Sequence, residues 1–217
     1  MKKLLFLTAV FAASYFAGHA QSTRVGFTAG TVFANYQSKA GGVSENLNSK
    51  TGLTAGILVD IPSGKHFSFQ PAVNFVQKGT KNEQTSGSVT EKVKLNVNCI
   101  EVPLNFLYNA GSNTGNFFIG AGPSLAFSLS GKTKFEDGTN STSENIKFGN
   151  GDNDDMKGLD LGANVITGYC FPNGLFLSVN YNTGLSNLAP GSSSDEKLTS
   201  HYFGIKLGIL LRGSGKK

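Results

Sequence analysis

Residues 159–188 decide the fold, and they run LDLGANVITGYCFPNGLFLSVNYNTGLSNL. On both sides of the central Pro-Asn-Gly, large apolar side chains occupy alternate positions, and small or amide side chains fill most of the positions between them. A period of two is typical of β-strands whose two faces meet different surroundings. Asn-Gly supplies the positive φ angles that a tight hairpin turn requires. The stretch therefore predicts two antiparallel strands, 159–171 and 175–188, joined by a short turn.

The same alternation continues toward both ends of the chain. In the fourth of the strands that it predicts, the apolar parity changes between Cys99 and Ile100, which indicates a β-bulge there. No stretch after residue 20 approaches 18 consecutive apolar residues, so we expect no transmembrane helix in that part of the chain. The fold class is therefore expected to be all-β, with eight strands at residues 24–36, 52–61, 67–79, 91–108, 117–130, 159–171, 175–188 and 202–212.

The connections between these strands alternate between long and short. This order places every long connection on one rim of a closed sheet and every short one on the other, and in bacterial barrels the short turns face the periplasm. We therefore expect an eight-stranded antiparallel up-and-down transmembrane β-barrel with long outer loops and short periplasmic turns, forming one domain over residues 21–217. The long connections are residues 37–51, 80–90, 131–157 and 189–198.

The first twenty residues differ from the rest of the chain. Lys2 and Lys3 precede an apolar run over residues 4–16, and Gly18 and Ala20 supply the small residues of a secretory cleavage site. The apolar run is shorter than the roughly 20 residues that a membrane-spanning helix needs. We therefore expect residues 1–20 to be a cleaved signal peptide, and the exported chain to lie in the outer membrane.

A soluble barrel shows the same alternation, with its apolar face turned toward a core instead of toward lipid. Three observations favour lipid as the partner of that face. The predicted strands are longer than the usual length of about 5 or 6 residues. Aromatic residues gather near both ends of the strands, as in the girdles of outer-membrane barrels. The opposite face is rich in Gly, Ser and Asn, which suit a narrow lumen. The alternative that stays open is a soluble periplasmic β-barrel that binds an apolar ligand.

Charged residues make up only 15% of the chain, and no cluster of Lys and Arg with interleaved aromatic residues suggests nucleic acid as a partner. Several charges nevertheless fall on the inward-facing side of the strands. Buried charges must pair or draw in water, so this pattern predicts a structural charge network in the lumen, with Glu101 and Lys206 at similar depth. The predicted members are Arg24, Asp60, Lys78, Glu101, Asp160, Lys206 and Arg212.

Catalytic and metal chemistry find little support in the sequence. His66 and His201 fall at opposite ends of the predicted barrel, and neither has Ser and Asp partners at a recognisable spacing. Residues 151–155, GDNDD, are rich in carboxylates but lack the spacing of a calcium-binding loop. Cys99 and Cys170 lie on non-adjacent strands at different heights, so we expect no disulfide. We predict no enzymatic activity, catalytic residue, metal or cofactor.

Three short segments resemble a known family. Residues 100–104, IEVPL, look like the LEIPL core of the Bacteroidetes outer-membrane β-barrel family, often labelled PorT-like or porin family. Residues 118–123, FIGAGP, resemble its GAGP strand, and residues 181–188, YNTGLSNL, its Y-x-x-GL-x-NL strand. The resemblance implies the eight-stranded fold, an outer-membrane address reached through the barrel-insertion machinery, and no shared catalytic residue. One departure is the end of the chain, residues 210–217, LLRGSGKK, where such barrels commonly end on an aromatic residue.

Together these patterns predict a non-enzymatic protein with a structural, surface-interaction or limited porin-like role. Loops on a rigid scaffold are where recognition usually occurs, so we expect an extracellular or envelope protein partner at the long loops. An open aqueous channel is not expected, because such channels belong to barrels of about 16 or more strands.

Overall fold

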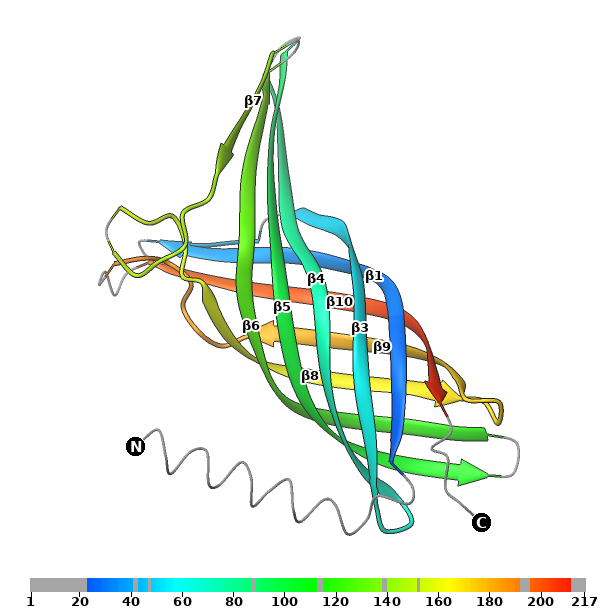
Figure 1. Ribbon diagram of the computed structural model, residues 1–217. Coiled ribbons are helices and arrows are strands. Elements are labelled where there is room, and N and C mark those ends of the chain that lie inside the picture. The colour runs from blue at the N-terminus through cyan, green and yellow to red at the C-terminus, as the bar shows by residue number, and fades with distance from the viewer. Residues whose placement is uncertain are drawn as a thin grey trace, which may run out of the picture.

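The chain forms an antiparallel sheet that closes on itself (Figure 1). The computed structural model describes residues 23–40, 43–46, 48–86, 89–112, 115–137, 140–151, 153–191 and 196–211. Within these ranges the strands are β1 (Arg24–Ala40), β2 (Val43–Asn46), β3 (Asn48–Ser63), β4 (Phe67–Ser86), β5 (Val89–Ser112), β6 (Gly115–Asp137), β7 (Asn140–Asn145), β8 (Leu159–Cys170), β9 (Leu175–Gly184) and β10 (Lys197–Leu211).

Eight of the described strands form the ring, in the order β1, β3, β4, β5, β6, β8, β9 and β10. The short strands β2 and β7 lie outside it and pair with β1 and β6. Antiparallel pairing of β1 with β10, from Val25 opposite Leu211 to Lys39 opposite Lys197, closes the ring. Closure pairs the backbone of every ring strand on both sides, as a bilayer requires. The predicted fold class, an eight-stranded antiparallel barrel, is confirmed.

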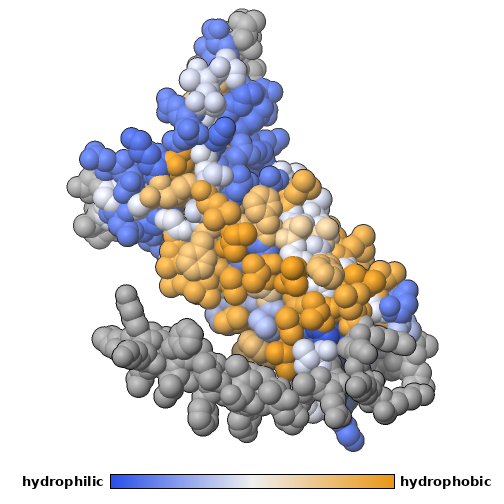
Figure 2. Space-filling view, in the orientation of Figure 1, coloured by the Kyte–Doolittle hydropathy of each residue, from blue (hydrophilic) through white to orange (hydrophobic). Residues whose placement is uncertain are grey.

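The apolar face of the ring points outward. Alternate residues of β10 show the rule: Phe203, Ile205, Leu207 and Ile209 are exposed, whereas Lys206 is buried. In the space-filling view the outward side chains merge into a broad apolar band across the visible face of the barrel (Figure 2), and exposed apolar side chains occur on every strand of the ring. Soluble proteins rarely expose a continuous apolar surface larger than a few hundred Å². The outward direction contradicts the alternative of a soluble barrel with an apolar interior.

Aromatic side chains border the band at both ends. At the end with the short turns, Phe67 packs edge-on against Tyr108, and Tyr169 packs edge-on against Phe171. At the other end lie Phe33, Phe75, Phe127 and Phe203, all exposed. Aromatic rings at both borders match the interface belts of membrane barrels.

No helix among the described residues is long and apolar enough to cross a membrane.

Several strands are longer than the sequence predicts. The segments 37–51 and 80–90, expected as loops, are largely strand, because β1, β3, β4 and β5 continue well past the apolar band. Beyond the band both faces of a strand meet water, so the apolar period of two disappears while backbone pairing continues. Likewise, 131–157 contains the end of β6 and all of β7, and β10 begins at Lys197, within the expected loop 189–198. Conversely, β9 ends at Gly184, before the predicted end at residue 188.

A bulge lies close to the position predicted in the fourth strand, between Asn98 and Cys99 in the pairing of β5 with β6, but the extra residue belongs to β6 and not to β5. Inward and outward side chains alternate through β5 without interruption, and Val97, Cys99 and Glu101 all point inward. The register shift lies in the neighbouring strand: Asn98 pairs with Ser130 and Cys99 with Ser128, which leaves Leu129 as the extra residue of β6. Val97 and Cys99 are apolar but face the lumen, whereas the apolar residues at alternate positions from Ile100 onward face outward. In the sequence this looks like a change in which alternate positions face outward, although the strand itself alternates regularly.

Two predictions fall outside the described residues. The expected signal peptide, residues 1–20, and the charged residue Arg212 both lie there, together with the tail 213–217.

Candidate functional site in the barrel lumen

The side chains inside the barrel form three layers along its axis. Strand β5 passes through all of them: Leu107 faces an apolar layer near the short turns, Asn105 and Glu101 face a polar layer, and Cys99 and Val97 face a second apolar layer near the long connections. The order follows from the sequence of inward-facing residues alone, since every second residue of a strand points to the same side.

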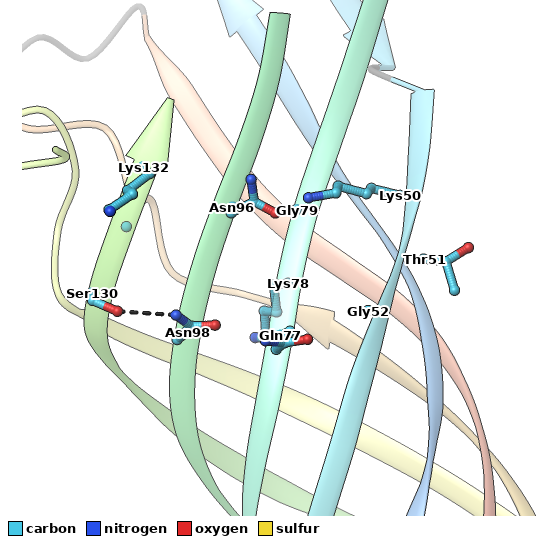
Figure 3. Close-up of a pocket in the computed structure, with 11 residues that line it drawn as sticks. Lys50, Thr51, Gly52, Gln77, Lys78, Gly79, Asn96, Asn98, Ser130 and Lys132 are labelled. Carbon is cyan, nitrogen blue, oxygen red and sulfur yellow. Dashed lines mark hydrogen bonds between the residues drawn. The ribbon is translucent and has the colours of Figure 1, made fainter. Parts of the chain in front are cut away.

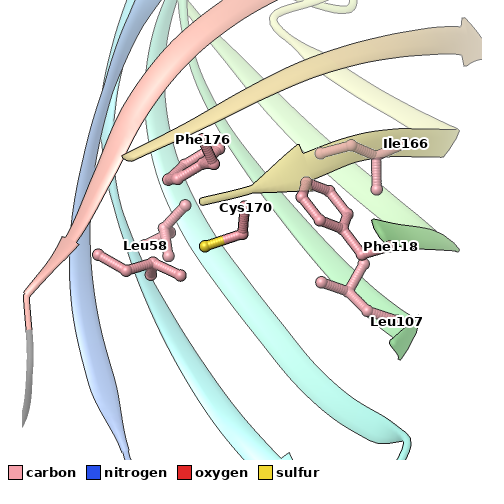
Figure 4. Packing of buried hydrophobic residues seen from close by; sticks show 7 residues of the cluster. Leu58, Leu107, Phe118, Ile166, Cys170 and Phe176 are labelled. Atoms are coloured by element: carbon pink, nitrogen blue, oxygen red, sulfur yellow. The ribbon is translucent and has the colours of Figure 1, made fainter. Parts of the chain in front are cut away.

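The apolar layer near the short turns, which we call the lower plug, draws side chains from six strands (Figure 4). Phe118 and Phe176 meet edge-to-face, with ring centroids 6.3 Å apart. All of its members are buried, so together they fill the cross-section of the barrel at this height. The lower plug consists of Leu58, Leu107, Phe118, Ile166, Cys170, Phe176 and Leu210.

Lys78 is the centre of the polar layer. Its Nζ lies 3.2 Å from Asp160 Oδ2 and 3.6 Å from Glu101 Oε2, and it donates a hydrogen bond to Ser200 Oγ at 3.3 Å. The same ammonium lies 5.5 Å from the centre of the Tyr202 ring. These groups are nearly fully buried, so the pairing offsets a desolvation cost that an unpaired charge would bear alone.

Hydrogen bonds in this layer join strands that are not neighbours in the ring. The Tyr202 hydroxyl of β10 donates to Glu101 Oε1 of β5, which lies on the far side of the ring. Farther along, Asn164 Nδ2 of β8 donates to Asn105 Oδ1 of β5 at 2.9 Å. Asn182 Nδ2 of β9 donates to Ser124 Oγ of β6 at 2.8 Å. Many of the polar side chains therefore pair with one another inside the barrel, while Thr54 Oγ1 and Asn180 Oδ1 are buried without a hydrogen-bond partner among the described residues.

The second apolar layer, the upper plug, closes the end with the long connections. Met156 and Leu188 come from connecting segments and pack with Tyr36, Val97 and Cys99 from the strands. Backbone hydrogen bonds hold this cover in place, since Lys157 N donates to Leu188 O at 2.9 Å and Gly149 N to Met156 O at 3.0 Å. The segment after β7 thus folds back over the mouth of the barrel.

The seven predicted site residues do not form one network. Lys78, Glu101 and Asp160 come together, as described. Arg24 and Asp60 form a separate pair at the short-turn end, with Arg24 Nη2 2.6 Å from Asp60 Oδ2. Lys206, expected at the depth of Glu101, is buried and makes no hydrogen bond or close ion pair with any described residue, although its charge interacts with that of Glu101 at longer range; the close contacts of Glu101 are with Lys78 and Tyr202. Arg212, as stated, is outside the described residues.

Sequence reasoning missed the uncharged partners. Ser200 and Tyr202 hold the two carboxylates, and Leu58, Phe118 and Phe176 fill the lower plug, yet none was predicted as a lumen residue. The signal was present, because each has the same parity as a predicted inward charge or amide on its own strand. The residues of the lower plug were not predicted as lumen residues because apolar side chains in a membrane barrel are expected to face lipid.

The described residues offer little for catalysis or metal binding. No group of three or more His, Cys, Asp or Glu side chains among them is arranged to hold a metal ion. In the acidic segment, Asp154 Oδ2 accepts a hydrogen bond from Gly151 N and Asp155 Oδ2 from Lys147 N, so these carboxylates stabilise their own loop. Both ring nitrogens of His201 lie against threonine hydroxyls. Cys99 and Cys170 are free thiols, as the sequence predicts.

Outside the lumen, the extended parts of β5 and β6 carry an ion-pair cluster. Glu136 lies between Lys94 and Lys134, with an oxygen 2.8 Å from each ammonium. Hydrogen bonds from Lys134 and then Lys94 lower the pKa of the Glu136 carboxyl from 4.5 to about 2. Lys92 and Glu83 form a longer exposed pair at 3.8 Å. This protruding region is therefore polar on its outer face (Figure 2).

Comparison with solved structures finds small outer-membrane barrels. Ail of Yersinia pestis, solved in complex with the heparin analogue sucrose octasulfate, is 12% identical, and the match covers 87% of this chain and 99% of Ail with a TM-score of 0.37. OprG of Pseudomonas aeruginosa is 12% identical over 88% of this chain and 95% of its own, with a TM-score of 0.42. Neisserial surface protein A is 14% identical over 84% and 96%, with a TM-score of 0.37. No curated protein matches the sequence.

A family match agrees with the closed ring and the outward apolar band. Residues 19–189, most of the chain, match the family described as outer membrane protein beta-barrel domain. The strand order, the direction of the apolar face and this match lead to one assignment: the chain belongs to the outer-membrane β-barrel domain family.

Proposed function

We propose that this protein is a non-enzymatic surface-interaction protein of the outer membrane, whose closed barrel serves as a scaffold for the strands that protrude from it. The observation that carries the proposal is the filled lumen. Among the described residues, two apolar plugs lie on either side of a polar layer that the Tyr202–Glu101 hydrogen bond crosses from one side of the ring to the other, and these side chains occupy the axis that a hydrated solute would need. A protein that does not conduct must act through its surfaces.

The protruding sheet is the surface best suited to recognition. β4, β5 and β6 continue far past the apolar band, and β7 adds a further strand along β6 (Figure 1). Every side chain of β7 is exposed. Recognition groups on a rigid scaffold lose little conformational entropy on binding. We propose that an envelope or extracellular protein binds here, in the region of the segments 80–90 and 131–157.

Conductance separates this role from a porin-like one. The full chain, refolded and inserted in a planar bilayer, should show no stepwise conductance in salt solution. A variant with Leu58→Gly, Phe118→Gly and Phe176→Gly, which removes the bulk of the lower plug, serves as a positive control for leakage through a loosened lumen. Steady conductance of the unaltered barrel, similar to that of the variant, would refute the closed-scaffold proposal.

Photo-crosslinking in living cells tests the surface role. A photoreactive residue placed at Thr142 of β7, which is fully on the protruding sheet, should give adducts with another protein. The same residue at Leu207, which is exposed in the apolar band, should give only lipid adducts. Protein adducts at Leu207 but none at Thr142 would place the interacting surface in the membrane and contradict the proposal.

A further inference from the structure

A groove of about 300 Å³ lies on the outer wall of the barrel, across β3, β4, β5 and β6 (Figure 3). Lys78, whose ammonium is paired inside the lumen, lies at the base of the groove, and the other lining residues with polar side chains are Lys50, Thr51, Gln77, Asn96, Asn98, Ser130 and Lys132. All carry nitrogen or oxygen donors, and no carboxylate lines the groove. Its volume is at the lower end of the range of small-molecule sites.

Two lysines give the groove an uncompensated positive charge. Neither Lys50 nor Lys132 forms an ion pair with any described residue. By contrast, Lys94 and Lys134, farther along the same strands, are neutralised by Glu136. The acidic residues that pair with lysines in this part of the sheet, Glu83 and Glu136, lie on its protruding part, and neither lines the groove.

The backbone is shaped to let Lys50 cross the sheet. Its aliphatic stem passes over Gly79 of β4, where a Cβ atom would lie 3.1 Å from Lys50 Cδ, and its ammonium points toward Asn96 of β5 (Figure 3). A side chain at Gly79 would also overlap the carbonyl oxygen of Leu95. Glycine at this position therefore leaves space for the stem of a lysine from β3 to pass over β4.

The amide and hydroxyl groups leave donors available. Gln77 uses its Oε1 to accept a hydrogen bond from Leu53 N at 3.3 Å, which leaves its amino group free. Ser130 Oγ accepts from Asn98 Nδ2 at 3.0 Å, so its own proton remains to be donated. Asn96 makes no hydrogen bond with any described residue. Two ammonium groups surrounded by donors of this kind suit a phosphate and the hydroxyls of an attached sugar.

The groove lies at the border of the apolar band. On three of the four strands that form the groove, an exposed apolar residue directly precedes it: these residues are Leu53 of β3, Phe75 of β4 and Leu129 of β6, and Thr51, Gln77 and Ser130 are the next outward residues. The apolar band marks the hydrocarbon layer, so this height is that of the lipid headgroups at the end with the long connections. A ligand attached to a lipid would meet the groove without leaving the membrane.

We propose that this groove binds the phosphorylated sugar headgroup of an outer-leaflet glycolipid, with Lys50 and Lys132 holding the phosphate. The site depends on the membrane placement of the barrel and not on the proposed surface-interaction role. The acyl chains of the same lipid would lie along Leu53, Phe75 and Leu129, so the ligand contacts the protein on both sides of the interface.

The test uses the refolded full chain in detergent micelles and three probes: bisphosphorylated lipid A, its fully dephosphorylated form, and inorganic phosphate. Binding is measured by isothermal titration for the unaltered chain and for Lys50→Gln/Lys132→Gln. The matched control is Lys39→Gln/Lys197→Gln, which removes two exposed lysines that face each other on β1 and β10, away from the groove.

We expect the bisphosphorylated lipid to bind the unaltered chain, and the groove variant to lose about 10- to 30-fold in affinity, with the control variant within about twofold. The loss should shrink as salt screens the lysines. Equal losses in the two variants would overturn the site, because only general charge would then matter. Equal affinity for the dephosphorylated lipid would overturn the role of the lysines, and equal affinity for inorganic phosphate would overturn the assignment to a lipid.

Discussion

At the scale of single residues, Lys78 and Lys206 show how context decides the role of the same side chain. Both are buried on the inside of the barrel. Lys78 is surrounded by Asp160, Glu101 and Ser200, whereas Lys206 has no such partner among the described residues. Removing one member of a buried ion pair leaves the opposite charge buried without a partner. This lowers the free energy of unfolding more than removing an unpaired cation does.

We therefore expect Lys78→Met to lower the free energy of unfolding by about 3 to 5 kcal/mol, since Glu101 and Asp160 would remain buried without a cation. The measurement is urea unfolding in lipid vesicles, followed by the shift in gel mobility between folded and boiled protein. Lys206→Met is the control, with a small loss or a gain in stability. Equal losses for the two variants would show that the ion-pair cluster is not what Lys78 contributes.

Glu136 makes a second prediction at this scale. Its pKa is lowered from 4.5 to about 2 by Lys134 first and Lys94 second. A carboxyl with a lowered folded-state pKa stabilises the fold above its ordinary pKa, and this contribution is lost as the pH falls from about 4.5 toward 2. NMR of the labelled Glu136 carboxyl carbon should give a midpoint near pH 2, and Lys134→Met should move it upward. A midpoint near 4.5 in the unaltered chain would contradict the cluster.

At the scale of elements, the seam between β1 and β10 is the contact that turns a sheet into a barrel. Gly30 of β1 lies opposite Lys206 in this seam, and a Cβ atom there would overlap the carbonyl oxygen of Ile205. Gly111 of β5 differs, because a Cβ atom would lie 3.3 Å from the flexible end of Asn116. Close backbone approach, rather than turn geometry, requires glycine at Gly30.

Gly30→Ala should therefore cost about 1 to 3 kcal/mol, because the backbone of the seam must move apart to admit the methyl group. Gly111→Ala should cost less than Gly30→Ala, since only the end of the Asn116 side chain has to shift by a few tenths of an ångström and the unfolded chain loses freedom. The fraction of refolded protein that keeps its faster, unboiled gel mobility reports closure for both variants. If Gly30→Ala kept as large a fraction of folded protein as Gly111→Ala, the close backbone approach at Gly30 would not limit closure of the barrel.

At the scale of the whole molecule, the apolar band decides where the protein resides. Leu207 lies in the middle of the outward apolar stretch 203–211 of β10 and is 68% exposed, the largest value among the exposed apolar side chains of the described residues. Phe135 is also exposed, at 42%, but belongs to the protruding part of β6, next to the ion pairs of Glu136. The two side chains differ mainly in their surroundings, lipid for the first and water for the second.

Leu207→Arg should accordingly lower stability in lipid vesicles by about 2 to 4 kcal/mol, the cost of an arginine on the lipid face near the bilayer midplane. Phe135→Arg should change it little. Unfolding of both variants by urea in vesicles of the same lipid gives the comparison. Should Phe135→Arg be the more damaging of the two, the height of the membrane along the barrel would have to be reassigned.

Local pattern was enough to predict most of the fold. Alternation along each strand is a property of neighbouring residues, so the eight strands, the Asn-Gly turn at residues 173–174 and the side that faces lipid follow from the sequence with no knowledge of the partners. The same holds for the separation of Cys99 and Cys170, which needs only strand order and height. The pattern failed where the apolar signal was absent, as in the protruding strands, or ambiguous, as at Cys99.

The contents of the lumen were decided only by the tertiary structure. Sequence showed which charges point inward, but whether Glu101 contacts Lys78 of the adjacent strand β4 or Lys206 of β10, across the ring, depends on the stagger and tilt of all the strands. The extra residue Leu129 likewise shifts the register of β6 against β5 by one residue, which depends on the pairing of the two strands. The direction in which a side chain points is therefore a local property of its strand, whereas its partner across the barrel is set by the closure of the whole sheet.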